Sequence, residues 1–256
     1  MKKVSALIII LAVIFAATSS SFAQPKLLIH VTGGYSLPLG ELKGDLADAF
    51  ATPPVVANPK KAYMKTGFNF GADIKYAFDK KGYFRGALGL GYNMFSNSYD
   101  LTTPVANTFK VKFNYFGFSI GPEVNFLPKG KANPFIGVDF TGNFYSGKQT
   151  WTTLDSNFTE STLTTGSRFG LAFGGGLDVK LGKKVGFVVG LKYNLINLIG
   201  KKAYDSTVTP TAGEYALYDK EYTQGGTTWN SMNLSDLKIY VGVTFFLMEP
   251  KKTVKK

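Results

Sequence analysis

The run Phe68–Phe78 alternates between large apolar side chains and small or polar ones. Its even positions are Phe68, Phe70, Ala72, Ile74, Tyr76 and Phe78, and its odd positions are Asn69, Gly71, Asp73, Lys75 and Ala77. Because successive side chains of a β-strand point to opposite faces, this pattern predicts a strand with one apolar and one polar face. A tilted strand needs about 9–11 residues to cross a bilayer. The length of the run therefore suits the wall of a membrane barrel.

Seven further segments repeat the same alternation, which makes eight predicted strands in all. They are residues 27–37, 84–94, 116–126, 136–144, 169–181, 187–195 and 237–247. The segment Phe109–Tyr115 fits only with the opposite parity. It predicts either a β-bulge near Tyr115 and Phe116 or an extension of the strand beyond the membrane.

The connections between the predicted strands alternate in length. Those after the second, fourth and sixth strands are short turns, at 79–83, 127–133 and 182–184. Those after the other strands are long, at about 40–66, 95–115, 146–167 and 197–235. Outer-membrane barrels have short periplasmic turns and long external loops. We therefore predict an all-β fold, an eight-stranded antiparallel transmembrane up-and-down β-barrel.

Alternation by itself does not say which face points outward. A soluble lipocalin-like barrel would turn the apolar face inward, around a ligand. The polar face of this chain carries few charges for a solvated surface, and large aromatics lie toward the strand ends on the apolar face, as interfacial girdles do. These aromatics are Tyr76, Phe78, Phe84 and Phe126 at the turn rim and Tyr35, Tyr92, Phe144, Phe169 and Tyr193 toward the loop rim. We therefore predict that the apolar face contacts lipid.

The N-terminus has the features of an export signal. Lys2 and Lys3 precede the apolar stretch Ala6–Ala17, and Ser21-Phe22-Ala23 offers a cleavage site. We expect a signal peptide over residues 1–23, a barrel over residues 24–247, a basic periplasmic tail over residues 248–256, and localisation in the cell outer membrane. The absence of Cys excludes disulfides and thiol chemistry.

Basic residues gather in the turns and in the tail. The formal net charge is +12. The turns contribute Lys80, Lys81, Lys129, Lys131, Lys183 and Lys184, and the tail contributes Lys251, Lys252, Lys255 and Lys256. Such lysines either keep the turns soluble or lie beside the headgroups of outer-membrane lipid. An exported chain of this kind has little use for nucleic acid, so we expect no nucleic-acid partner.

Charged residues on the polar parity project into the barrel lumen. They are Asp73, Lys75, Arg85, Glu123, Asp139, Asp178, Lys180, Lys192 and Lys238. An eight-stranded lumen is just wide enough for side chains to fill it, and buried charges are costly unless they are paired. The mixed signs predict an ionic plug in which Asp73 and Lys75 find partners among Arg85, Lys238, Glu123 and Asp139. The alternative is that the same residues line a narrow path for ions or small solutes.

Enzymatic activity has little support in the sequence. Acyl transfer needs a base beside a nucleophile, and the one histidine, His30, lies on the lumen-facing parity. A lipid A-modifying site would need its histidine on the lipid-facing side. One histidine and scattered carboxylates also lack the spacing of metal ligands. We expect no catalytic residues, no metal site and no cofactor.

Several short motifs resemble those of small outer-membrane β-barrel domains of the Bacteroidota type, related in architecture to OmpX and to the OmpA N-terminal barrel. They are Tyr35–Gly40, Pro134–Val138 and Gly174–Gly182. The C-terminal Tyr240–Leu247 is similar to the signal read by the outer-membrane β-barrel insertion machinery, with Tyr240, Gly242, Phe245 and Leu247 at its positions. The resemblance implies a fold and an insertion route.

The predicted external loops are polar, with isolated aromatics such as Trp151, Tyr218, Tyr222 and Trp229. Glu41–Phe50 could form a short amphipathic helix through Leu42, Leu46 and Phe50. Binding sites favour loops on rigid scaffolds. We therefore expect a monomeric, non-enzymatic membrane protein with a structural role, or with recognition or adhesion of an unknown extracellular ligand through its loops.

Overall fold

In the computed structural model, the described residues are 26–47, 61–101, 107–153, 158–205, 211–224 and 226–247. The predicted signal peptide, the predicted tail and Phe50 lie outside them. The long strands of this part are β1 (Leu27–Gly40), β2 (Thr66–Ala77), β3 (Phe84–Leu101), β4 (Asn107–Asn125), β5 (Ala132–Thr153), β6 (Phe158–Lys180), β7 (Val185–Ile199) and β11 (Leu234–Leu247).

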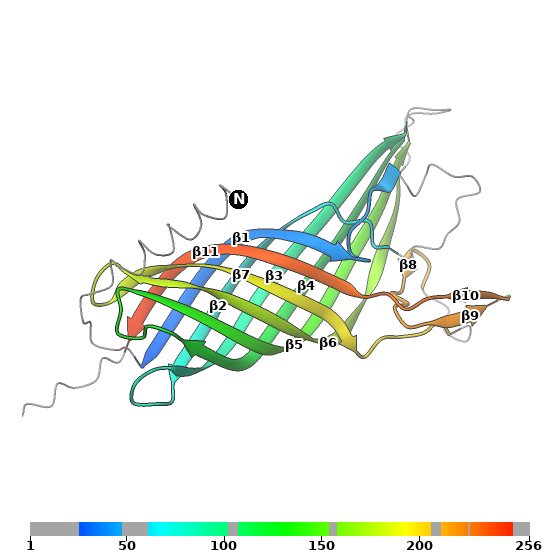
Figure 1. Cartoon of the computed structure of the whole chain (residues 1–256). Coiled ribbons are helices and arrows are strands. Elements are labelled where there is room, and N and C mark those ends of the chain that lie inside the picture. Colours follow the sequence, from blue (N-terminus) through cyan, green and yellow to red (C-terminus); the bar gives the residue numbers. More distant parts are fainter. Residues whose placement is uncertain are drawn as a thin grey trace, which may run out of the picture.

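These eight strands form a closed antiparallel ring within the described residues (Figure 1). Each strand pairs with its neighbours in the order β1 to β7, and β11 pairs with both β7 and β1. The closing seam runs from Leu27 opposite Leu247 to Gly40 opposite Leu234. The predicted eight-stranded up-and-down barrel is confirmed.

The apolar face of the strands points outward. Phe68, Phe70, Ile74 and Leu88 are all exposed, and Phe70 is 57% accessible. An exposed apolar surface of this extent marks contact with a membrane rather than with water. The lipocalin-like alternative, with the apolar face inside, is therefore wrong. In the described part of the chain, no helix has the length and apolar character needed to cross a bilayer.

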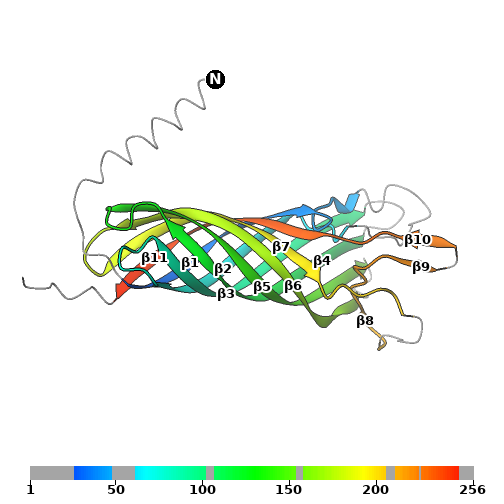
Figure 2. The same ribbon diagram turned by 60° about the horizontal axis from the view of Figure 1, so that its bottom comes forward.

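Four neighbouring strands are much longer than the other four. Strands β3, β4, β5 and β6 have 18, 19, 22 and 23 residues, whereas β1, β2, β7 and β11 have 12 to 15. The long strands continue beyond the loop-side rim as a curved sheet, drawn in green tones in Figures 1 and 2. We call this sheet the extension. It occupies most of the residues predicted as loops at 95–115 and 146–167, so those two loop predictions were wrong.

The reversed parity of Phe109–Tyr115 comes from this extension. The β3–β4 ladder runs without a register shift from Phe84 opposite Val124 to Leu101 opposite Asn107. The predicted bulge at Tyr115 and Phe116 is therefore absent from this ladder, and strand extension is the correct alternative. Above the membrane the outer face meets water and the inner face is apolar, so the hydrophobic positions change sides while the strand continues.

A cluster of buried apolar residues fills the inside of the extension and the barrel mouth. It combines Phe95, Phe113 and Leu163 from the long strands with side chains from the first loop and the end of β7. Its other members are Leu42, Leu46, Met64, Val111, Tyr115, Tyr145, Ile196, Met232 and Leu234. The helix expected over Glu41–Phe50 was wrong for its first half, because residues 41–45 form a turn and a β-bridge between Lys43 and Met64, and only Leu46 and Ala47 are helical. The first loop thus folds inward and covers the lumen.

The last long connection contains three short strands. Strand β8 (Glu214–Tyr215) pairs in parallel with Thr162 and Leu163 of β6. Strands β9 (Tyr222–Gln224) and β10 (Thr227–Trp229) form a separate hairpin, which projects from the loop end in Figure 1.

The backbones of β4 and β5 approach each other closely at Gly121. Their ladder omits Gly121 and Pro122, and proline has no N–H to donate. A Cβ on Gly121 would lie 1.9 Å from the carbonyl oxygen of Val138. Only glycine fits this position without moving one of the two backbones.

We predict that Gly121→Ala destabilises the barrel by about 2–3 kcal/mol, because the added methyl group overpacks a backbone contact. Gly182→Ala is the control, since a Cβ on Gly182 meets no atom within 4 Å. The measurement is a urea titration of the fraction that shows folded mobility on unheated gels. Equal midpoints for the two variants would contradict the close approach.

Candidate functional site

The inner wall of the barrel carries the charged residues that the sequence projects into the lumen. Of the nine, Asp73, Lys192 and Lys238 are half-buried. The other six are buried: Lys75, Arg85, Glu123, Asp139, Asp178 and Lys180. The alternating pleat of each strand explains this placement, because inward-facing positions recur every second residue.

A compact charged layer lies toward the turn end of the lumen. Lys75 Nζ donates a hydrogen bond to Glu123 at 2.5 Å, and the Arg85 guanidinium pairs with the same carboxylate. Arg85 also reaches Asp178 at 3.0 Å. His30 Nε2 lies 3.0 Å from the other oxygen of Asp178. Five side chains from β1, β2, β3, β4 and β6 are thereby connected across the barrel.

Phe135 completes this layer with an aromatic face. It is buried, and Lys75 Nζ lies 3.9 Å from its ring centroid, with Arg85 at 5.6 Å. A cation over an aromatic face is attracted to the ring quadrupole. The Phe135 ring therefore contacts the sides of the Lys75 and Arg85 cations that the carboxylates leave uncovered.

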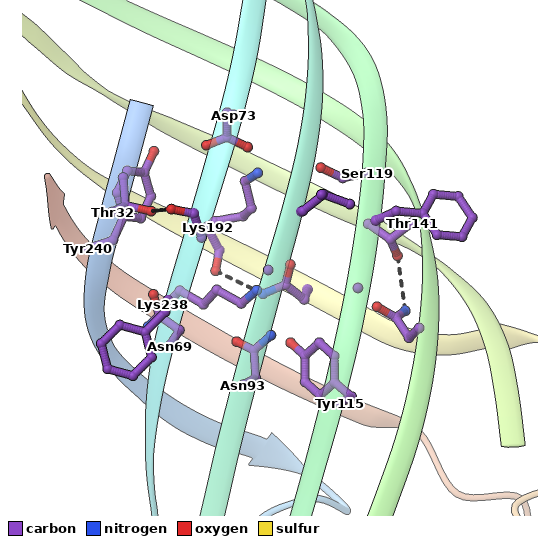
Figure 3. Close-up of a pocket in the computed structure, with 18 residues that line it drawn as sticks. Thr32, Asn69, Asp73, Asn93, Tyr115, Ser119, Thr141, Lys192, Lys238 and Tyr240 are labelled. Carbon is purple, nitrogen blue, oxygen red and sulfur yellow. Dashed lines mark hydrogen bonds between the residues drawn. The ribbon is translucent and has the colours of Figure 1, made fainter. Parts of the chain in front are cut away.

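A polar cavity of about 70 Å³ lies on the loop side of the charged layer. Figure 3 shows Asp73, Asn93, Lys192 and Lys238 around it. Lys192 pairs with Asp139 at 2.9 Å. Among the described residues, Asp73 and Lys238 have no oppositely charged group within 4.0 Å. Lys238 lies over the Tyr115 ring instead, with its Nζ 5.4 Å from the centroid.

The loop side of the cavity is bounded by a second set of buried polar groups. The Tyr115 hydroxyl donates to Asp236, and Asn194 Nδ2 donates to the other oxygen of Asp236 at 2.6 Å. Above them lies the apolar cluster of the mouth. The cavity thus lies between the charged layer and the mouth of the barrel.

A buried carboxylate, Asp219, ties the last loop to the barrel wall. Arg168 of β6 holds it in a bidentate arrangement, with Nε 2.9 Å and Nη2 2.7 Å from its two oxygens. Asn197 Nδ2 donates to it at 2.8 Å and the backbone N–H of Lys202 at 2.9 Å. The Asp219 carbonyl accepts the backbone N–H of Met232 at 2.9 Å. We call this arrangement the Asp219 clamp.

Sequence reasoning missed Arg168, Asp219, Asp236 and Phe135. Arg168 and Phe135 lie one residue outside predicted strands, and Asp236 lies one residue before one, each on the polar parity of the strand that it adjoins. Extending the alternation by one position would have found all three. Asp219 is in a loop, and no pattern in the sequence indicates that it returns to the wall.

The charges of the described interior balance. Six basic side chains face six carboxylates, with His30 not counted. The basic residues are Lys75, Arg85, Arg168, Lys180, Lys192 and Lys238, and the acidic ones are Asp73, Glu123, Asp139, Asp178, Asp219 and Asp236. Within the described residues, no three His, Asp or Glu side chains are grouped so as to hold a metal ion.

The residues of the expected insertion motif lie on both faces of β11. Phe245 and Leu247 are exposed on the outer face. Tyr240 lines the cavity, and a Cβ on Gly242 would lie 2.1 Å from the Val31 carbonyl oxygen. The role of this motif in insertion stays a prediction.

A family profile described as outer membrane protein beta-barrel domain matches residues 22–200. The chain belongs to this family. It is an outer-membrane protein whose wall contacts membrane lipid, and its short turns face the periplasm by the general architecture of such barrels. No curated protein sequence matches the chain.

Solved structures with a similar fold are distant in sequence. Neisserial surface protein A is 12% identical, covering 86% of this chain and 97% of its own, with a TM-score of 0.45. The outer membrane protein OprG from Pseudomonas aeruginosa is 13% identical, covering 87% and 96%, with a TM-score of 0.43. The attachment invasion locus protein Ail of Yersinia pestis is 11% identical, covering 87% and 99%, with a TM-score of 0.37.

We predict that Glu123→Gln destabilises the folded barrel by about 3 kcal/mol, because it leaves Lys75 and Arg85 buried without their shared carboxylate. Glu160→Gln is the control. Glu160 forms an ion pair with Lys148 at 2.6 Å on the outer surface of the extension, and its loss should cost at most about 1 kcal/mol. Urea titration of unheated gel mobility measures both. Similar midpoints would show that the charged layer contributes no more than a surface pair.

We further predict that Asp219→Ala releases the last loop while the barrel stays closed. Loss of one partner of a buried ion pair costs roughly 3–5 kcal/mol. Arg168 and Asn197 belong to β6 and β7, but they lie apart from the charged layer that connects the strands near the turns. Trypsin should cleave after Lys220 faster in the variant, with the heat-dependent gel shift retained. Glu214→Ala, which changes an exposed carboxylate of the same connection away from the scissile bond, should leave cleavage unchanged. Equal protection of both variants would exclude the clamp.

Proposed function

We propose that this chain is a non-enzymatic outer-membrane barrel that uses its external loops and extension for recognition or adhesion. The observation that carries this proposal is the unequal length of the wall strands. Four strands continue well past the rim, and their inner face is packed as a core with the first loop. A barrel that served only to span the membrane would not need such a structured external part.

The packing of the lumen supports the same function. The charged layer around Glu123 lies below the cavity, and the apolar cluster lies above it. A continuous water path would have to separate paired buried charges at one end and expose apolar side chains at the other, and both changes are costly.

A narrow channel for ions or small solutes is the second candidate. It is favoured by the polar cavity beside Asp73 and Lys238. The balance of charge in the lumen argues against ion selectivity, since channels that select by charge concentrate one sign.

A structural role for His30 supports the non-enzymatic assignment. Its ring is buried inside the wall, and its Nε2 lies 3.0 Å from the Asp178 carboxylate. A base for acyl transfer to or from membrane lipid would need access to the outer surface, where the acyl chains lie.

The last loop offers the most distinctive external surface. The rings of Tyr204, Tyr218, Tyr222 and Trp229 contact one another, with centroid distances of 5.2 to 6.3 Å. Tyr222 and Trp229 stack face to face across the β9–β10 hairpin. Tyrosine and tryptophan are enriched at binding hot spots because their rings are rigid and combine apolar and polar contact.

The chain is proposed to act as a monomer that the insertion machinery recognises through Tyr240, Gly242, Phe245 and Leu247. The β1–β11 seam, which pairs every residue of β1 with β11, supports this proposal. The barrel needs no strand from a second copy in order to close.

The test uses cells of a Gram-negative host that display the full chain, incubated with arrays of extracellular glycans and matrix proteins. We expect saturable binding that falls about tenfold or more in the Tyr222→Ser, Trp229→Ser double variant, because aromatic hot spots carry much of the affinity. Thr223→Ala, Thr228→Ala is the matched control in the same hairpin and should retain binding.

Planar-bilayer recordings of the purified barrel decide between the two candidates. We expect no unitary current above the lipid baseline. A stable current that disappears on substitution of Lys75 or Asp139, together with no ligand on any array, would overturn the recognition function in favour of a channel.

A further inference from the structure

The short turns carry a ring of exposed lysines at the periplasmic end of the barrel. In the described residues this ring consists of Lys26, Lys80, Lys81, Lys129, Lys131, Lys183 and Lys184. We call it the lysine rim. All seven side chains are exposed, and they come from the start of β1 and from each of the three turns that Figure 2 shows at the end opposite the extension.

The rim is where the described charge of the molecule is concentrated. The interior is balanced, with six basic and six acidic side chains. The external end of the described chain carries nine lysines and seven carboxylates, spread over the extension and the loops. The rim has seven lysines and a single carboxylate, that of Asp79. A small surface at one end thus has a net charge of +6.

The carboxylate of Asp79 is engaged by the backbone of its own turn. Its two oxygens accept the N–H groups of Lys81 at 3.0 Å and Phe84 at 2.9 Å. Burial raises the pKa of Asp79, but the backbone donors together outweigh it, so the pKa of this carboxyl is lowered. The group therefore fixes the shape of the turn and offsets only one of the seven positive charges.

Each turn holds its lysines at the edge of the lipid-facing surface. Lys80 and Lys81 lie between Phe78, which is 72% exposed, and Phe84. Lys183 and Lys184 lie between Leu181, which is 68% exposed, and Val185.

The third turn repeats this arrangement. Lys129 and Lys131 follow Phe126, whose ring is exposed on the outer face. Apolar side chains enter the hydrocarbon, and a lysine a few residues away then reaches the headgroup layer with its flexible stem. All three turns therefore present ammonium groups at the depth of lipid phosphates.

We propose that the lysine rim binds anionic phospholipid of the periplasmic leaflet, with phosphatidylglycerol as a representative headgroup. The three turns join successive pairs of strands and are therefore spaced around the barrel. Their lysines can thus contact lipid phosphates on several sides of the barrel. A cell-wall polymer would need a groove or a projecting arm, and the turns are short and flush with the lipid-facing side chains. Binding of this kind orients the barrel and gives it a shell of selected lipids.

The test measures the lipid preference of the folded full-length chain. The chain is refolded in detergent, incubated with equimolar phosphatidylglycerol and phosphatidylcholine, and examined by native mass spectrometry for bound lipid. Because each lysine near an anionic surface favours binding, we expect phosphatidylglycerol to exceed phosphatidylcholine by about tenfold. Sodium chloride at about 0.5 M should lower the ratio, because it screens exposed charges.

Two variants with the same loss of charge locate the effect. The rim variant changes Lys80, Lys81, Lys129, Lys131, Lys183 and Lys184 to Gln. The control variant changes six exposed lysines of the external end to Gln, namely Lys43, Lys61, Lys65, Lys110, Lys112 and Lys220. Both should keep the heat-dependent gel shift, because none of these side chains lies in the interior.

The expected result is a ratio near one for the rim variant and an unchanged ratio for the control. The proposal is overturned if the wild-type chain binds both lipids equally. It is also overturned if the rim variant keeps its preference, or if the control loses as much as the rim variant. The wild-type chain is also incubated with isolated peptidoglycan. If it binds peptidoglycan and shows no lipid preference, the rim is assigned to the cell wall instead.

Discussion

The central constraint on this molecule is that charges inside a narrow barrel have no bulk water to surround them. The alternation of the strands sends acidic and basic side chains inward from nearly every strand, and the lumen is only a few side chains wide. Glu123 and Asp178 resolve the conflict near the turns by sharing Arg85 and by taking Lys75 and His30 as further partners. The wall is consequently tied together from within as well as by its ladders.

The same strands work in two environments, and this explains the shape of the external part. Within the membrane the apolar side chains of β4 point outward to lipid, as Phe116 does. One residue earlier, Tyr115 points inward to the core of the mouth. The strand does not bend or slip at this point. The surroundings change from lipid to water, and the face that has to be apolar changes with them.

Much of the fold could be predicted from the sequence, because a bilayer demands a regular pattern. The two-residue alternation and the length of a membrane strand are visible in runs such as Phe68–Phe78. The three short turns follow from the spacing between such runs. The extension was predicted only as one of two alternatives for Phe109–Tyr115, and most of its residues were assigned to loops because their apolar positions follow the reverse parity. The pattern was present in Phe109, Val111, Phe113 and Tyr115, and its meaning depends on where the membrane ends.

The sequence predicted which charged residues face the lumen, but it did not predict which of them form ion pairs. Parity alone placed Lys75, Glu123 and Asp178 inside, whereas the partners depend on the relative stagger of strands that are distant in sequence. Asp73 illustrates the difference, because it was expected to find a direct partner and lies beside a cavity instead. The position of Asp219 could not be predicted from hydrophobic periodicity, because it lies in a loop. Its place is determined by its contacts with Arg168 and Asn197.

The Asp219 clamp has a consequence for how such a protein can change over time. It fastens the last loop at its neck, close to where the chain leaves β7 and enters β11. The hairpin beyond the neck contributes nothing to closing the barrel. Its sequence can therefore drift, lengthen or be exchanged for another while the same wall and the same neck continue to carry it, so the membrane part and the external hairpin are free to evolve at different speeds.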